Sequence, residues 1–311
     1  MGLTDGMKAM GIANRVPAWP QRLRWFPLAG AVVTGGMTLV MPVAVVESLV
    51  VNEPAAFFVG VAMTLLAAFA TVGLAGIAGV RHLRLSKRIV VCQDDLGAGI
   101  AIPSRRHLAP LLVGLGSTSV VGLVVAAGWF LGVDAGPLAA DDRGQAHLLT
   151  VGGIAASALF AAFLGFHSVK EVRLYPGGVR RMVTLRRLWS TRTVDTFVPW
   201  DDIVELEADE QVVRGVFEVR NPIIWLISGP ALPESSRLRF DEPNQVRVDA
   251  HLLVAEPNTL LTVMLALRES APLRRSLADS GASALLTPPP LRARLWAQTS
   301  ASATRESSAP R

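Results

Sequence analysis

Four long apolar segments constrain this chain more than any other feature of its sequence. They cover residues 26–50, 55–80, 108–133 and 147–166, and charged residues lie on both sides of each. A helix rises 1.5 Å per residue, so each segment is long enough to cross a hydrocarbon core about 30 Å thick. Only 18% of the chain is charged, whereas an average soluble domain has about 25%. We therefore predict an α-helical membrane bundle of four transmembrane helices over 26–167.

Lysine and arginine gather in alternate connections of this predicted path. The N-terminal segment 1–25, the loop at about 81–107 and the segment after the fourth run are all basic. By contrast, the 51–54 turn has no basic residue, and the 134–146 loop has only Arg143. Cytoplasmic loops carry such an excess of positive charge. We expect a multi-pass protein of the inner or plasma membrane with both termini in the cytoplasm.

The basic loop at about 81–107 contains a structural element of its own. Residues 88–92 and 100–102 are β-like runs, and Asp94-Asp95-Leu96-Gly97 between them has the composition of a turn. We predict a small cytoplasmic β-hairpin here. It follows the first pair of helices as the C-terminal domain follows the second, which hints at a degenerate two-fold repeat.

The apolar segments themselves hold almost nothing ionisable. Glu47 lies near the outer end of the first segment, and His147 and His167 lie at segment ends. Charges within a membrane commonly line ion or proton pathways, so their scarcity argues against a pump but leaves a passive pore open. Small residues such as Gly73, Gly76 and Gly79 suit close helix packing. We expect these small residues to pack helices together within one four-helix bundle. A contact between two copies of the chain, in a homo-oligomer, remains an alternative.

From residue 168 to about 278 the composition becomes that of a water-soluble, β-rich domain. Short alternating runs recur at 8–12-residue spacing with turn signals between them, the pattern of an antiparallel sandwich or barrel. They cover 172–175, 179–185, 193–199, 203–207, 212–219, 223–227, 236–240 and 245–254. One amphipathic helix at 257–269 follows, with Pro257 at its start. Residues 279–311 are rich in Ser, Ala, Pro and Arg, and we expect a disordered tail.

Several motifs of this domain resemble those of bacterial pleckstrin-homology-like (PH-like) domains, which often follow transmembrane helices. The first comprises Leu174, Tyr175, Gly178 and Val179, and the second runs from Val198 to Ile203 as Val-Pro-Trp-Asp-Asp-Ile. The terminal helix, with the sequence after it, resembles the way such domains end in actinobacterial membrane proteins. The likeness covers about a third of the chain, and residues 221–244 fit it less well. It implies a half-open barrel of strands closed by one α-helix, and a role in binding rather than catalysis.

No catalytic or cofactor-binding constellation is present in the sequence. The five histidines are scattered without metal-ligand spacing, and the single cysteine, Cys92, excludes a multi-cysteine metal site or an internal disulfide. We expect Asp201 and Asp202 to position a turn, and His251 to pack in or beside the last strand. Aromatic residues outside the apolar runs are too few for base stacking, so we expect no nucleic-acid partner. We expect a protein that is not an enzyme and holds neither metal nor cofactor.

One basic group has functional potential. It comprises Arg180, Arg181, Arg186, Arg187 and Arg192, close in sequence to the fourth span. Such arginines can simply fix topology on a solvated strand face. Alternatively, they hold the domain against anionic lipid headgroups or an acidic protein partner, because the guanidinium fork suits phosphate oxygens. The preferred hypothesis is a scaffold or anchor whose PH-like domain binds lipid headgroups or a partner protein. The alternative is a transport or channel-accessory protein that uses the four-helix bundle.

Overall fold

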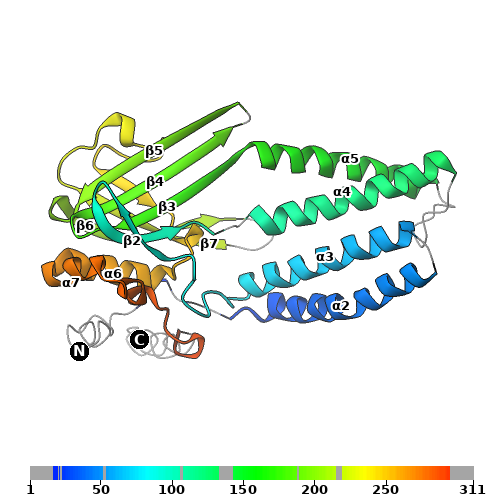
Figure 1. Cartoon of the computed structure of the whole chain (residues 1–311), viewed down its shortest axis with the longest axis horizontal. Helices are drawn as coiled ribbons and strands as arrows, with labels where there is room; N and C mark the ends of the chain where they lie inside the picture. The colour runs from blue at the N-terminus through cyan, green and yellow to red at the C-terminus, as the bar shows by residue number, and fades with distance from the viewer. Residues whose placement is uncertain are drawn as a thin grey trace, which may run out of the picture. The chain divides into compact units, whose positions relative to one another are not determined.

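A computed structural model describes residues 17–19, 21, 23–51, 54–105, 108–132, 143–187, 189–214 and 219–294. The chain divides into two compact units. One contains 22–81 and 106–167, and the other contains 1–21, 82–105 and 168–311. The first unit is helical and the second is rich in β-strands (Figure 1).

Within the described residues, the helical unit has four helices long and apolar enough to span a membrane, which agrees with the predicted number. They are α2 (Trp25–Val50), α3 (Pro54–Ile77), α4 (Leu108–Leu131) and α5 (Arg143–Gly165). α2 packs against α3, α3 against α4, and α4 against α5, so that neighbours in sequence are neighbours in space (Figure 1). Most of their large apolar side chains are exposed in the protein alone, as expected for surfaces that face lipid.

Each helical pair is joined by hydroxyl groups and by small residues. Thr71 of α3 donates a hydrogen bond to Thr34 of α2 at 2.9 Å, and Ser119 of α4 bonds Ser157 of α5. Gly122 and Gly153 lie at a close approach of α4 and α5, since a Cβ added to Gly122 would lie 2.4 Å from the Cα of Gly153. These contacts are typical of helix packing in membranes, where apolar side chains gain little by leaving lipid.

The β-rich unit contains two antiparallel sheets. In the described part of the chain, the first has five strands in the order β1-β2-β3-β4-β5, and the second has three in the order β6-β7-β8. The strands are β1 (Val90–Asp94), β2 (Gly97–Pro103), β3 (His167–Leu174), β4 (Gly178–Arg187), β5 (Ser190–Pro199), β6 (Ile203–Val213), β7 (Val219–Ser228) and β8 (Gln245–Val248). The described strands form these two sheets and no closed barrel.

The predicted hairpin in the loop between α3 and α4 is present as β1 and β2. Gly97 closes its turn with φ +95°, a conformation that glycine adopts at little cost. β2 then pairs with β3, for example Ile102 opposite Val172, so the hairpin forms one edge of the domain's own sheet. A segment that the sequence placed within the transmembrane region thus supplies two of the five strands.

Two of the predicted strands are wrong. Residues 212–219 include a reversal, because β6 ends at Val213 and β7 begins at Val219, with 215–218 outside the described residues. β-branched residues on both sides of this reversal favour strand, so the sequence predicted one continuous strand here. Residues 236–240 form no strand, because the Asp241 carboxylate fixes this loop by accepting a hydrogen bond from the Leu238 amide at 2.6 Å.

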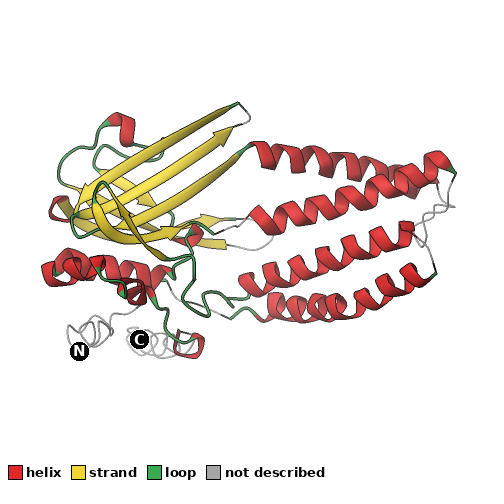
Figure 2. Ribbon diagram, viewed as in Figure 1, coloured by secondary structure: helices red, strands yellow, loops and turns green. Residues whose placement is uncertain are grey.

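The core lies between the sheets and α6 (Pro257–Glu269), whose bounds agree with the predicted helix. Figure 2 shows α6 and the short α7 (Ala271–Arg275) on one side of the strands. The expected tail differs from the structure, since η7 (Ala282–Leu286) buries Leu285 and Leu286 in the same core. The Ser- and Ala-rich composition of this segment predicted disorder, although Leu285 and Leu286 pack into the core. Residues 295–311 lie outside the described part.

Three separate stretches of chain therefore build the β-rich unit. The first precedes α2, the second connects α3 to α4, and the third follows α5. Two helices separate each stretch from the next.

Candidate functional site on the β4–β5 hairpin

The five arginines of the predicted basic group all lie on the β4–β5 hairpin, but in three different environments. The strands pair with Arg181 opposite Thr196, Leu185 opposite Arg192, and Arg187 opposite Ser190. Side chains alternate between the two faces of a sheet. Arg181, Arg187 and Arg192 therefore share one face, and Arg180 and Arg186 share the other.

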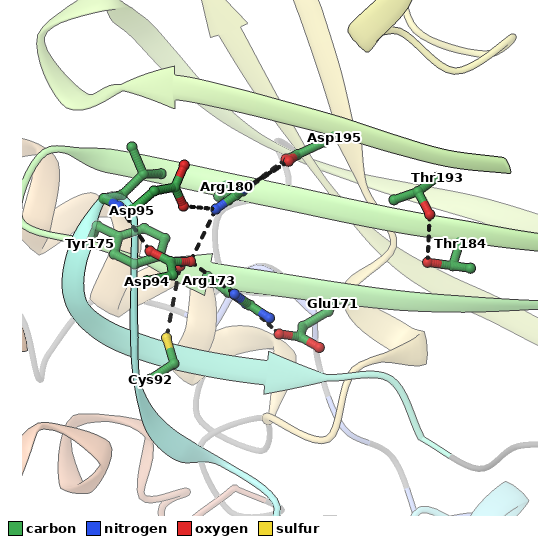
Figure 3. Close-up of polar contacts among 11 residues, drawn as sticks. Cys92, Asp94, Asp95, Glu171, Arg173, Tyr175, Arg180, Thr184, Thr193 and Asp195 are labelled. Carbon is green, nitrogen blue, oxygen red and sulfur yellow. Dashed lines mark hydrogen bonds and ion pairs between the residues drawn. The ribbon is translucent and has the colours of Figure 1, made fainter.

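Arg180 is held by three carboxylates from two neighbouring hairpins (Figure 3). Its Nη1 lies 3.0 Å from Asp94, the last residue of β1, and 2.8 Å from Asp95 in the β1–β2 turn. Its Nη2 lies 2.6 Å from Asp195 on β5. The hydrogen bond to Asp195 raises the pKa of Arg180, although desolvation acts against that rise. With its donors committed to these partners, Arg180 fastens strands together.

Asp94 is the centre of the same network (Figure 3). It accepts hydrogen bonds from the Tyr175 hydroxyl, from Nη1 of Arg173 at 2.9 Å and from the Leu96 amide at 3.0 Å. Desolvation raises the pKa of the Asp94 carboxyl, but these donors outweigh it, so the pKa lies below the ordinary value. Desolvation and the bond to Asp94 in turn raise the pKa of Tyr175. The network joins the β1–β2 hairpin to the strands that follow α5.

Arg181 lies inside the domain. Its side chain is 3% exposed, and its two terminal nitrogens lie 2.8 and 2.5 Å from the carboxylate of Asp241, which is fully buried. The same nitrogens donate to the Arg247 carbonyl at 2.9 Å and to the Thr196 hydroxyl at 3.0 Å. A buried arginine paired in this way cannot meet a ligand at the surface. Its role is to hold the 229–244 loop to the sheet.

Arg186, Arg187 and Arg192 have the environment that a binding role requires. All three are exposed, and among the described residues their side chains make no hydrogen bond or ion pair. The last buried side chains of the two strands are Val183 and Val194. Beyond these valines the hairpin leaves the core, and its end carries three cations. We call residues 186–192 the hairpin tip.

The tip also contains a residue that the sequence analysis did not single out. Trp189 is 92% exposed, whereas Trp19 and Trp200 of the same unit are 6% and 1% exposed. The buried pair donate their indole N–H groups to backbone carbonyls, Trp19 to Asp209 and Trp200 to Tyr175. The position of Trp189 in a short basic turn, Arg186-Arg187-Leu188-Trp189, was the available signal.

Other residues considered from the sequence have structural positions. Asp201 lies in the short turn η3 (Trp200–Asp202) and pairs with Arg274 of α7 at 2.7 Å. His251 lies in η5 (Ala250–Leu252), just after the last strand, and its Nδ1 is 3.2 Å from the Pro222 carbonyl. Desolvation lowers the pKa of His251. Within the described ranges, no group of three His, Cys, Asp or Glu side chains could hold a metal ion.

Comparison with protein-family models, with curated proteins and with solved structures found no match for this chain.

Proposed function

We propose that this protein is a non-enzymatic membrane anchor whose cytoplasmic, PH-like domain binds anionic lipid headgroups through the β4–β5 hairpin tip. The observation that carries the proposal is the exposure of Arg186, Arg187 and Arg192, which have no partner among the described residues. Two antiparallel sheets followed by α6 agree with the PH-like resemblance.

The path of the chain supports an encounter between the tip and a bilayer. β3 begins at His167, two residues after α5 ends at Gly165. Three basic segments contribute to one folded unit, and basic segments favour the cytoplasmic side, where the leaflet is anionic. Each arginine close to such a leaflet contributes about 1 kcal/mol, so the three together contribute about 3 kcal/mol.

The test requires the full chain, because the domain is assembled from three stretches separated by helices. We would reconstitute it in nanodiscs of phosphatidylcholine with or without phosphatidylglycerol, and measure amide hydrogen exchange over residues 184–193. Exchange should slow about tenfold or more when the anionic lipid is present. The R186Q/R187Q variant should lose most of this protection.

A matched control removes the same charge elsewhere. Arg239 and Arg275 are exposed residues of the same unit outside the tip, so R239Q/R275Q should keep the lipid-dependent protection. If both variants lose this protection equally, the protection depends on net charge alone and the proposed site is wrong. If protection appears only after a protein fraction is added, whatever the lipid composition, the tip binds a protein and the lipid proposal is wrong.

A further inference from the structure

The exposure of Trp189 suggests that its indole contacts another molecule. It is the most exposed large hydrophobic side chain among the described residues, at 92%. No hydrogen bond or ring contact of Trp189 is present in the described part of the chain. An indole has a large apolar body and one N–H donor, and so suits a place that is apolar on one side and wet on the other.

The cations around this indole lie on both faces of the hairpin. Arg187 and Arg192 share one face of the strands, and Arg186 lies on the opposite face. A folded protein partner usually covers one face of a strand pair. Headgroups of a lipid leaflet surround an inserted hairpin on every side. The two-sided arrangement therefore favours a bilayer interface over a protein surface.

The direction of the strands puts the tip at the end of the sheet where the chain enters from α5. The β3–β4 hairpin closes at Tyr175 and Gly178, whose backbone groups exchange hydrogen bonds of 2.9 and 3.3 Å. The start of β3 and the end of β4 both lie away from this closure, at the opposite end of the sheet. His167 at the start of β3 follows the end of α5 by two residues, so the far end of β4 lies at the end of the sheet where the chain enters it.

We propose that Trp189 enters the boundary between headgroups and acyl chains of an anionic leaflet, while Arg186, Arg187 and Arg192 bind phosphate oxygens around it. The ligand class is a phospholipid bilayer surface and not a single headgroup held in a pocket. This inference rests on the proposed function and deepens it. It adds an apolar insertion step to a site that charge alone could hold at the surface.

The experiment measures the depth of the tip in the full chain. Cys92 is the only cysteine, so the C92S background allows one new labelling site. A nitroxide at S190C lies beside Trp189, and its collisions with oxygen and with a water-soluble nickel chelate report depth. In nanodiscs that contain phosphatidylglycerol, we expect the oxygen-to-nickel ratio to rise about tenfold over phosphatidylcholine alone, as for apolar groups at the acyl boundary.

Two controls separate insertion from surface binding. W189A in the C92S/S190C background should return the ratio close to its value in phosphatidylcholine, and an exposed side chain can be replaced without loss of the fold. A label at S235C, on the exposed η4 turn (Glu234–Ser236), should stay in water in both lipids.

The outcomes distinguish this inference from the function beneath it. If the S190C label stays in water while residues 184–193 remain protected from exchange by anionic lipid, insertion is wrong and headgroup binding stands. If neither signal depends on anionic lipid, both proposals fail. An increased ratio that W189A does not lower would also overturn the role given to Trp189.

Discussion

Trp19 and Asn258, 239 residues apart, exchange two hydrogen bonds. The Trp19 amide donates to Oδ1 of Asn258 at 3.0 Å, and Nδ2 of Asn258 donates to the Trp19 carbonyl at 3.0 Å. Trp19 precedes the first span by a few residues, and Asn258 lies in the first turn of α6, after the last sheet. The pair fastens the start of the chain to a domain that is completed only after the fourth span.

We predict that N258A releases this N-terminal segment. Loss of two hydrogen bonds of about 1 kcal/mol each should destabilise the attachment by about 2 kcal/mol. Hydrogen exchange at the amides of Ala18 and Trp19 should accelerate, because the exchange rate of an amide depends on the stability of its local structure. N244A is the matched control, since Asn244 is exposed and its side chain bonds no described residue. Unchanged exchange in N258A would remove the proposed attachment.

Local patterns were sufficient to predict the helices. Four apolar runs predicted the four described helices that are long enough to cross a membrane, and the periodicity after Pro257 predicted α6 with the same bounds as in the structure. The pairing of β2 with β3 joins residues about 70 positions apart, and no local pattern encodes such a partner. For the same reason, the sequence predicted a hairpin in the 81–107 loop without indicating that it completes the C-terminal sheet.

The site was predicted only in part, for a related reason. Five arginines close in sequence suggested one basic surface. Two of them, however, form ion pairs with carboxylates that lie far away in the sequence. Asp241 lies 60 residues from Arg181, and Asp94 lies 86 residues from Arg180. Strand alternation does assign Arg180 and Arg181 to opposite faces. Alternation does not show that each of these arginines pairs with a carboxylate, and it does not show that Trp189 is exposed.

Close contact between α4 and α5 makes a second prediction. A Cβ at Gly122 would lie 2.4 Å from the Cα of Gly153, which is backbone and cannot rotate away. The G122A variant must separate the helices, and overpacking of this kind costs about 1–3 kcal/mol. The melting temperature in mild detergent should fall. In contrast, G152A, in which the added Cβ meets nothing within 4 Å, should melt at or above the wild-type temperature. Equal melting of both variants would contradict the helix contact.

The buried pair of Arg181 and Asp241 makes a third prediction. D241N leaves the Arg181 guanidinium buried without its counter-charge, which costs about 3–5 kcal/mol in comparable pairs. Denaturant unfolding followed by hydrogen exchange in β4 and β5 should show this loss. Arg274 and Asp201 form a similar pair at 2.7 Å, but the Asp201 side chain is 87% exposed. D201N should therefore cost less than about 1 kcal/mol. Similar costs for the two substitutions would refute the structural role of Arg181.

Asp94 makes the last prediction, on the dependence of stability on pH. Its pKa is lower in the folded chain than in the unfolded chain, despite desolvation, because Tyr175 and Arg173 donate to the carboxylate and Arg180 pairs with it. Such a group stabilises the fold above its unfolded pKa, and this contribution disappears as the pH falls through the folded pKa. Attachment of the β1–β2 hairpin should therefore weaken in acid, with faster amide exchange over residues 90–103.

The D94N variant separates this effect from other acid-sensitive groups. Asp249 also has a lowered pKa, since its pairing with Lys170 outweighs desolvation, so some acid sensitivity should persist in every variant. D94N should show fast exchange in β1 and β2 already at neutral pH, and little further change there on acidification. D95N should behave like the wild type, because the Asp95 side chain is 71% exposed and, among the described residues, its carboxylate pairs with Arg180 alone. Acid weakening of the hairpin that persists unchanged in D94N would show that another carboxylate holds it.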